Sequence, residues 1–153
     1  MAHLEMDLEE YVNELLQSIG KSLDLPGLAL DDNGHCVLLF DDKVVLNMEF
    51  DREKELLIIY SYIGEVPYEG REIIFETLLE SNLFWKDTQG ATIGIDKQTQ
   101  TVVLAFPMEL PLKRKENFEE RLALFVDITE SWINKLEKMS ADAESIANED
   151  SGE

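Results

Sequence analysis

The sequence of 153 residues contains few of the side chains that build disulfides, metal sites and membrane anchors. It has one cysteine, Cys36, and two histidines, so neither an internal disulfide nor a C-x-x-C or H-E-x-x-H zinc motif is available. No uncharged apolar run approaches the roughly 18 residues that a transmembrane helix requires. The N-terminus lacks the basic and apolar regions of a secretory signal. Together these absences predict a protein of a reducing, intracellular compartment that does not cross a membrane.

Basic residues are scarce as well, because 13 Lys and Arg stand against 33 Asp and Glu, which gives a net charge of −20 at pH 7. The one basic cluster, Lys113-Arg114-Lys115, falls in a predicted loop before a helix, and a solvated loop accounts for it. Binding to phosphate requires clustered Lys and Arg, so nucleic acids and anionic membranes are disfavoured as partners. The same charge keeps a protein soluble while it exposes apolar surface to a partner.

Motifs for catalysis and cofactor binding are also missing, since the chain contains no G-x-G-x-x-G, Walker A or G-x-S-x-G sequence. His35 and Cys36 are adjacent, so in a strand they point to opposite faces and cannot act together. The run Asp31-Asp32-Asn33-Gly34 is similar to a calcium loop, but its Gly comes too early and Asp42 stands where the loop needs Glu. We therefore expect a turn at residues 31–34, no metal, no cofactor and no enzymatic activity.

Three segments have the apolar spacing of amphipathic helices. The first covers residues 4–23, carries acidic residues in its first turns and ends at Asp24-Leu25-Pro26-Gly27. The second covers residues 69–83. The third begins near Glu116 and continues for about 22 residues, with an apolar face that must be buried on a sheet or on another chain. Its pattern stops after Ser140.

Alternating apolar residues predict strands between the first two helices. Asn33-Gly34 is a strong hairpin signal, and it joins residues 28–30 to residues 35–40. Short turns then lead to strands over residues 44–50 and 56–63. The strand over 56–63 is apolar on both faces, so we expect it to be central in the sheet. These turns are short enough to indicate an antiparallel meander.

A second hairpin is predicted between residues 91–95 and residues 101–108. The element order is therefore helix, three-stranded meander, helix, two-stranded hairpin, helix. This order predicts a single α+β domain with a mainly antiparallel, twisted sheet packed with helices. We expect the domain to cover residues 1–140. Residues 141–153 contain five acidic residues and no basic one, which is typical of a disordered tail.

Apolar surface is more plentiful than one small sheet can bury, because all three predicted helices have wide apolar faces. Leu83, Phe84 and Trp85 at the end of the second helix add to the excess. Each of these residues taken alone is best explained as core. A small domain has a limited interior, however, so part of the excess is predicted to contact a second subunit or a client protein.

Several local patterns resemble those of a known family. They are Leu23-Asp24-Leu25-Pro26-Gly27 after the first helix, Asp32-Asn33-Gly34-His35-Cys36, Ile63-Gly64-Glu65-Val66-Pro67, and Leu78-Leu79-Glu80-Ser81-Asn82-Leu83 leading to Gly90-Ala91-Thr92-Ile93-Gly94-Ile95. Together with the element order and the low pI, they resemble the class I type III secretion chaperones, the CesT/Tir-chaperone-like family. The last pattern is the most specific. Gln89-Gly90 departs from it, because relatives often carry two glycines there, and this affects only the local turn.

The resemblance implies a cytoplasmic homodimer in a Gram-negative bacterium. Such proteins bind the extended, unfolded N-terminal segment of a secretion effector without ATP and without hydrolysing it. The segment fills apolar patches and can add a strand to the chaperone's sheet. It is thereby kept soluble and competent for secretion. The implied partners are effectors and a second copy of the chain, with the secretion ATPase as a further candidate.

The resemblance also implies sites, although each residue concerned is equally a candidate for the core. In this family the second helix, here residues 69–83, and the strand after it commonly build the dimer interface, which here indicates Leu78, Leu79, Leu83, Trp85 and Ile93. Client contacts commonly come from the first helix and the meander, which here indicates Leu8, Leu15, Ile19, Leu38, Phe40, Leu46 and Met48.

Two other functions remain open. An acidic adaptor or anti-activator that sequesters a basic partner would release that partner at moderate salt. A small enzyme or ligand carrier would need a deep, enclosed cavity with converging polar groups.

Overall fold

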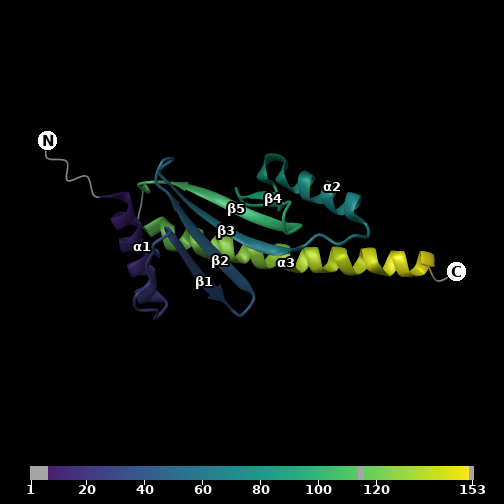
Figure 1. The fold of residues 1–153 in the computed structure, drawn as a ribbon, viewed down its shortest axis with the longest axis horizontal. Helices are drawn as coiled ribbons and strands as arrows, with labels where there is room; N and C mark the ends of the chain where they lie inside the picture. The colour runs from purple at the N-terminus through teal and green to yellow at the C-terminus, as the bar shows by residue number, and fades with distance from the viewer. Residues whose placement is uncertain (1–6, 114–115, 152–153) are drawn as a thin grey trace.

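The structure is a computed structural model that describes residues 7–113 and 116–151. Helices and strands alternate in the order expected for the predicted α+β domain (Figure 1). The elements are α1 (Leu8–Ser22), β1 (His35–Phe40), β2 (Val44–Asp51), β3 (Leu56–Glu65), α2 (Arg71–Asn82), the short 3-10 helix η1 (Leu83–Trp85), β4 (Thr92–Asp96), β5 (Thr101–Glu109) and α3 (Glu116–Ser151). The predicted fold class is therefore confirmed.

The five strands form one antiparallel sheet with the order β1-β2-β3-β5-β4. β3 is the central strand, as its two apolar faces predicted. Its Ile59 pairs with Met48 of β2 on one side and with Phe106 of β5 on the other. β1 and β4 are the two edges, so these strands are the ones with backbone groups available to other segments.

One face of the sheet is covered, and the other is not. Residues of β2, β3 and β5 that point to the covered face, such as Leu46, Leu57 and Leu104, are completely buried against α1 and α3. α3 runs along this face and α1 lies at one end of the sheet (Figure 1). Trp132 of α3 is buried and donates its indole N–H to the carbonyl of Asp87 at 3.0 Å. None of the described helices covers the opposite face, and most of its side chains contact solvent.

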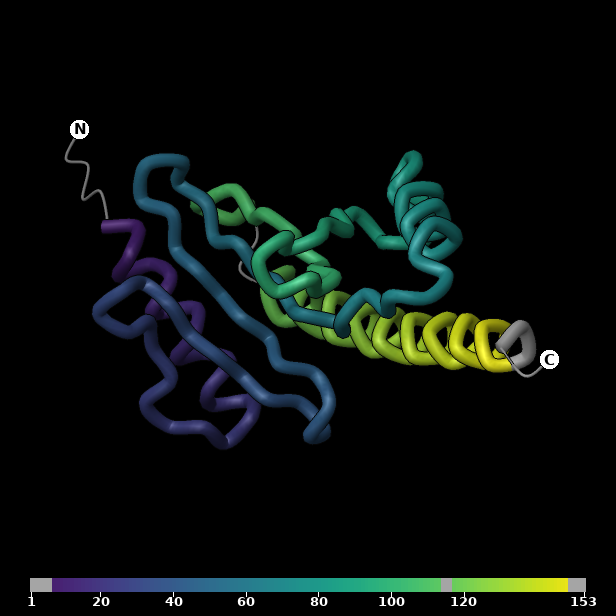
Figure 2. Tube along the Cα trace, turned by 45° about the vertical axis from the view of Figure 1, so that its right-hand side comes forward, coloured from purple at the N-terminus to yellow at the C-terminus, as the bar shows by residue number. Residues whose placement is uncertain are grey.

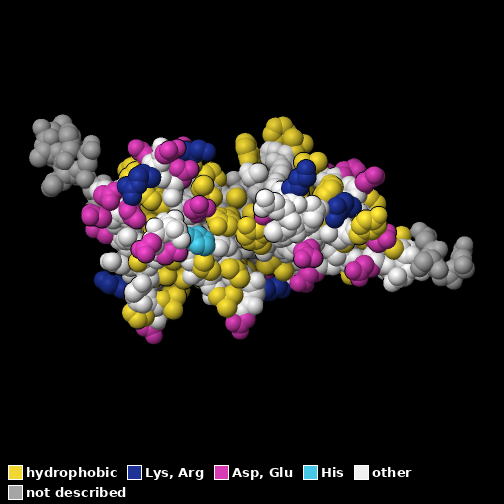
Figure 3. All heavy atoms as spheres, in the orientation of Figure 1, with side chains coloured by type: hydrophobic (Ala, Val, Ile, Leu, Met, Phe, Trp, Pro, Cys, Tyr) yellow, Lys and Arg dark blue, Asp and Glu magenta, His cyan; other side chains and the backbone are white. Residues whose placement is uncertain are grey.

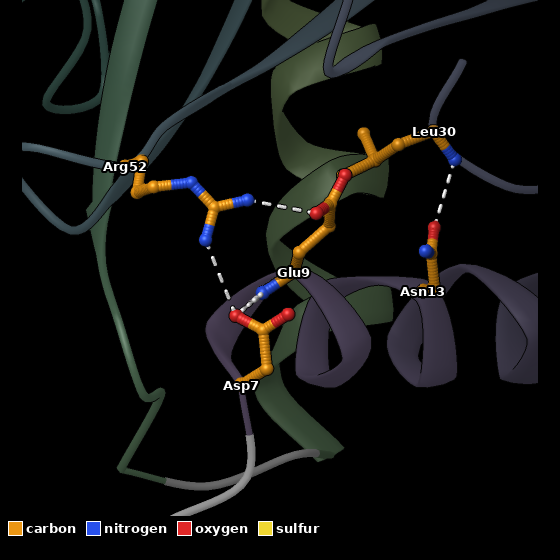
Figure 4. Close-up of polar contacts among 5 residues, drawn as sticks. All are labelled: Asp7, Glu9, Asn13, Leu30 and Arg52. Carbon is orange, nitrogen blue, oxygen red and sulfur yellow. Dashed lines mark hydrogen bonds and ion pairs between the residues drawn. The ribbon is translucent and has the colours of Figure 1, made fainter. Parts of the chain in front are cut away.

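Polar contacts hold α1 on the sheet (Figure 4). Asp7 caps the helix by accepting a hydrogen bond from the backbone N–H of Glu9. The guanidinium of Arg52, in the turn after β2, lies 2.8 Å from Glu9 and 3.4 Å from Asp7. Asn13 accepts a hydrogen bond from the backbone N–H of Leu30 at 2.8 Å. Burial of Val12 and Leu16 keeps the apolar side of α1 against the core, and these polar contacts add to it. Residues 4–6 of the predicted helix lie outside the described residues.

The predicted strand over residues 28–30 is wrong. The turn at Asn33-Gly34 is present, because Asp31 accepts a hydrogen bond from Gly34 at 3.0 Å and donates one to the carbonyl of His35 at 2.8 Å. The chain before the turn does not pair with β1, however, since the N–H of Leu30 is bonded to Asn13 of α1. A side-chain contact between distant segments has replaced the strand pairing.

α3 is much longer than the sequence predicted, because it continues past Ser140 to Ser151. Alanines at 141, 143 and 147 are strong helix formers, and Ala143 packs against Gly70 at the start of α2. This end of α3 extends beyond the sheet and has α2 beside it (Figures 1 and 2). The predicted end of the helix is therefore wrong, while the domain boundary at residue 140 stays a prediction.

Candidate functional site

The backbone of β1 is open along part of the sheet edge. The backbone N–H of Phe50 donates a hydrogen bond to the carbonyl of Gly34, which sets the register of β1 on β2. In an antiparallel ladder with this register, the backbone N–H and C=O groups of every second residue point away from β2. These residues are His35, Val37 and Leu39. At His35 both groups are taken by Asp31, whose N–H donates at 2.8 Å and whose carboxylate accepts at 3.0 Å. No hydrogen bond among the described residues uses the outward groups of Val37 and Leu39. These two residues form the open part of the edge.

Apolar side chains lie beside this open backbone on the uncovered face. Val37 is 49% exposed and Leu39 is 60% exposed. Val45, opposite Leu39 in the β1–β2 register, and Tyr62 of β3 are exposed on the same face. Figure 3 shows apolar side chains gathered across this side of the molecule. Open strand backbone next to exposed apolar side chains is the arrangement that an extended peptide uses to join a sheet.

A polar and aromatic cluster ties the same face together across three strands. His35 of β1 contacts Asn47 of β2 at 3.2 Å and the hydroxyl of Tyr60 of β3 at 3.4 Å, both through Nε2. The His35 and Tyr60 rings stack, and Tyr62 packs edge-on against Tyr60. Burial raises the pKa of Tyr60, and Glu49 and Tyr62 raise it further. The cluster fixes the strand end next to the open edge.

At the other sheet edge, a side chain occupies the outward backbone groups of Ile93. Asn82, the last residue of α2, accepts a hydrogen bond from the N–H of Ile93 at 2.8 Å and donates one to the carbonyl of Ile93 at 2.9 Å. The side-chain amide therefore takes the place of a neighbouring strand at this point of β4. It also fastens the end of α2 to the sheet, so that α2 lies along this edge.

Large apolar side chains are exposed at the end of α2. Leu79, Leu83 and Phe84 are exposed, and Trp85 is 59% exposed. Phe84 and Trp85 both have left-handed backbone angles, with φ of 55° and 53°, a conformation that costs about 1–2 kcal/mol in a residue with a Cβ. A groove of about 530 Å³ lies next to them between α2 and β4 and includes Phe75, Leu79 and Ile95. We call Leu79, Leu83, Phe84 and Trp85, together with the groove beside them, the α2–β4 surface.

The predicted client residues point to the covered face of the sheet. Five of them are buried and two are partly buried in the core of the single chain. The buried ones are Leu15, Ile19, Leu38, Leu46 and Met48, and the partly buried ones are Leu8 and Phe40. Their assignment to client binding stays a prediction. Sequence reasoning missed Val37, Leu39 and Val45 on the uncovered face, although the alternation in β1 and β2 contained that signal.

The predicted dimer residues divide into two groups. Leu79, Leu83 and Trp85 are exposed together on the α2–β4 surface, whereas Leu78 and Ile93 lie buried beneath it. Their role in a dimer also stays a prediction. The contacts of Asp31 and Asn82 with the sheet edges were not recognised from the sequence. The pattern Leu78-Leu79-Glu80-Ser81-Asn82-Leu83 was recognised, but not the bond that its asparagine makes.

Groups suited to metal or nucleophilic chemistry are sparse in the described part of the chain. Within residues 7–113 and 116–151, no three His, Cys, Asp or Glu side chains are grouped to hold a metal ion. Cys36 is buried, and burial, together with the Asp31 carboxylate, raises the pKa of its thiol. No helix in those same ranges has the length and apolar character needed to cross a membrane.

Comparisons with known proteins show the family and the fold. Residues 14–133 match the Tir chaperone protein (CesT) family. The transcriptional anti-antiactivator ExsC of Pseudomonas aeruginosa is 32% identical over 142 residues, which cover 93% of this chain and 96% of ExsC. The crystal structure of the ExsC–ExsE complex matches at 32% identity with a TM-score of 0.74, over 86% of this chain and 97% of the matched chain. The HopA1–SchA chaperone–effector complex has the same fold at 19% identity, with a TM-score of 0.69, over 82% of this chain and 95% of the matched chain.

Proposed function

Because the chain belongs to the Tir chaperone (CesT) family, we propose that it binds the extended N-terminal segment of one or more type III secretion effectors in the cytoplasm. It keeps the segment soluble and competent for secretion, without ATP and without a chemical step. The observation that carries this proposal is the open backbone of Val37 and Leu39 beside exposed apolar side chains. A segment held there cannot fold or aggregate while it is bound.

The open edge suits an unfolded client for a physical reason. Backbone groups of β1 can pair with almost any extended sequence, so they supply affinity with little sequence preference. Alternate client side chains then lie beside Val37 and Leu39, at the border of the apolar patch that continues to Val45 and Tyr62, which selects for apolar residues at every second position. Asp31 already occupies the groups of His35, and the paired strand therefore ends at that point. The expected client motif is a short strand with alternating apolar residues.

We further infer that the protein is a homodimer through the α2–β4 surface. Leu79, Leu83 and Trp85 are exposed there at a cost in free energy that a partner subunit would remove. A twofold contact buries the same patch on both copies, so one exposed surface is sufficient to form it. This surface lies at the opposite edge of the sheet from β1, which leaves the client edge accessible in each subunit.

A second function is favoured by one specific finding, the 32% identity to ExsC, whose name describes a transcriptional anti-antiactivator. Under this proposal the chain also controls gene expression by sequestering a regulatory protein. A regulator of this kind and a secretion client would compete for the open edge of β1. Competition is measurable by adding the client to a preformed complex with the regulator, and simultaneous binding of both would contradict it.

The edge is tested by Val37→Pro, which removes the outward N–H of Val37 without removing a bond between β1 and β2. Val37→Thr is the matched control because it keeps the N–H and changes only the side chain. We expect Val37→Pro to weaken client binding by about tenfold or more, and Val37→Thr by much less. Binding is measured by calorimetry with the N-terminal segments of type III secreted proteins from the same genome.

Hydrogen exchange gives an independent measure. The amides of Val37 and Leu39 are expected to become protected when the client binds, because they enter a ladder. Unchanged exchange at both amides, or equal affinity of the Pro and Thr variants, would show that the client binds elsewhere. Melting temperatures of both variants show whether the fold is retained.

A further inference from the structure

A second groove lies on the far side of α2 from the α2–β4 surface. It has a volume of about 300 Å³ and runs between α2 and the last turns of α3. Its lining residues are Glu69, Gly70, Ile73, Ile74, Thr77, Met139, Asp142, Ala143, Ile146 and Ala147. Figures 1 and 2 show this part of α3 extending beyond the sheet with α2 beside it. One wall of this α2–α3 groove lies outside residues 14–133, which are the residues that match the family.

The walls of the α2–α3 groove are held at a defined separation. A Cβ atom placed on Gly70 would lie 2.8 Å from the Cβ of Ala143, so the chain at the start of α2 lies directly against this methyl group of α3. Gly70 also has a φ of 68°, which turns the chain into α2. The packing of the start of α2 against α3 therefore sets the width of the groove.

Two large apolar side chains in the groove are exposed to solvent. Ile73 is 70% exposed and Ile146 is 59% exposed, and they come from the two opposite walls. Met139, Ala143 and Ala147 follow one another at intervals of four residues along α3. Apolar side chains repeated at each turn on two neighbouring helices form the seat into which a third helix packs.

The charged residues in the lining of the α2–α3 groove are both acidic. Glu69 and Asp142 are part of the lining, and the lining contains no Lys or Arg. None of the ion pairs among the described residues uses either carboxylate. In contrast, the groove between α2 and β4 includes Arg71 and Lys97. The two sides of α2 therefore differ in charge as well as in position.

We propose that the α2–α3 groove binds an amphipathic helix of a partner protein, with an apolar stripe flanked by Lys and Arg. The apolar stripe would cover Ile73 and Ile146, and the basic flanks would face Glu69 and Asp142. A second copy of the same groove is a poor occupant, because it would bring acidic rims together. This site is separate from the open edge of β1 and serves a different partner.

The experiment uses the full chain and a labelled, amidated peptide of about 18 residues with Leu at helical spacing and Lys elsewhere. A peptide of the same composition in scrambled order has no apolar stripe and is the peptide control. Fluorescence anisotropy compares the wild type with the Ile73→Ser/Ile146→Ser and Glu69→Lys/Asp142→Lys variants. Val37→Ser/Leu39→Ser is the matched control, since it removes exposed apolar side chains from the other edge.

We expect both groove variants to bind the helical peptide about tenfold or more weakly, while the β1 variant binds like the wild type. The methyl signals of Ile73 and Ile146 in the wild type should shift during the titration, a result that does not depend on any variant. Equal affinity for all variants and for the scrambled peptide would mean general attraction to the net charge, and the proposal would be wrong. It would also be wrong if Ile73→Ser/Ile146→Ser abolished self-association, since the groove would then be a contact between copies. Because the β1 variant is measured separately, failure here is distinct from failure of the proposed client site.

Discussion

Asn82 connects α2 to β4 through both polar atoms of its side chain. An edge strand normally exposes its N–H and C=O groups and is prone to pair with other chains. Here the amide satisfies both groups of Ile93 with the geometry of a strand neighbour. Asp31 does the same for His35 at the opposite edge. Two short polar side chains thus occupy the outward backbone groups of His35 at one edge and of Ile93 at the other, and those of Val37 and Leu39 stay open at the β1 edge.

Replacing Asn82 tests this role. We expect Asn82→Ala to lower the free energy of unfolding by about 1–3 kcal/mol, because it leaves the partly buried groups of Ile93 without partners. Asn117, an exposed residue in the first turn of α3, is the control, and Asn117→Ala should change stability by less than about 0.5 kcal/mol. Urea denaturation measures both. Equal losses would indicate that the Asn82 bonds do not support the edge.

The raised pKa of Tyr60 predicts a pH dependence. Burial, and then Glu49 and Tyr62, favour the protonated phenol in the folded protein. The contribution to stability is therefore complete below the ordinary pKa of about 10 and is lost as the pH rises through the raised value. Phenolate absorbance of the wild type against Tyr60→Phe measures the pKa. Glu49→Gln should lower it, and an unchanged value would show that Glu49 does not act on Tyr60.

At the level of elements, α3 continues as a helix beyond the end of its apolar stripe. The apolar stripe that ends near Met139 covers the sheet, and the buried side chains of the core end at Leu136. Beyond this point the helix is supported by its own propensity and by α2. The contact of Gly70 with Ala143 joins these two helices, and it also builds the α2–α3 groove.

This helix contact is testable by a double-mutant cycle. Gly70→Ala is expected to destabilise the protein by about 1–3 kcal/mol, because the new Cβ collides with Ala143 and the φ of 68° is unfavourable for alanine. Ala143→Gly removes the opposing methyl group and alone costs about 1 kcal/mol of helix propensity. The double variant should lose less than the sum of the two, because the collision is absent. Strict additivity in thermal denaturation would contradict the contact.

For the molecule as a whole, the acidic charge and the exposed apolar surface act together. A net charge of −20 opposes non-specific association of single chains, in which Leu83 and Trp85 are exposed. Association then requires a partner that covers enough apolar surface to overcome the repulsion. On this basis, dimerisation should strengthen as salt screens the like charges.

The dimer is tested with charged residues at its proposed centre. We expect Leu83→Glu and Trp85→Glu to convert a dimer into a folded monomer, because both side chains are exposed in the single chain and contribute little to its core. Light scattering at micromolar concentration gives the mass, and Leu39→Glu at the other sheet edge is the control. A wild-type monomer would refute self-association, and dimeric variants would refute this interface.

The sequence alone was sufficient for the types and order of the elements, because apolar periodicity is a local property of helices and strands. It also indicated the central place of β3, whose two faces are both apolar, and the membership of the family. The same local logic failed at residues 28–30, where a long-range bond from Asn13 replaced strand pairing. It failed again in α3, where helix propensity and the contact of Ala143 with Gly70 continue the helix without a wide apolar stripe.

Only the tertiary structure decided which apolar residues face solvent. Leu38 and Leu39 are alike in sequence, yet α1 and α3 cover the face that Leu38 shares with the core and leave Leu39 exposed. A period of two identifies two faces of a strand but does not say which one a helix will cover. The bonds of Ile93 at the β4 edge likewise depend on Asn82, which reaches this strand from the end of α2. The composition therefore determines that the protein is acidic and has apolar side chains to spare for a partner. Packing between distant parts of the chain determines where its exposed apolar surfaces lie.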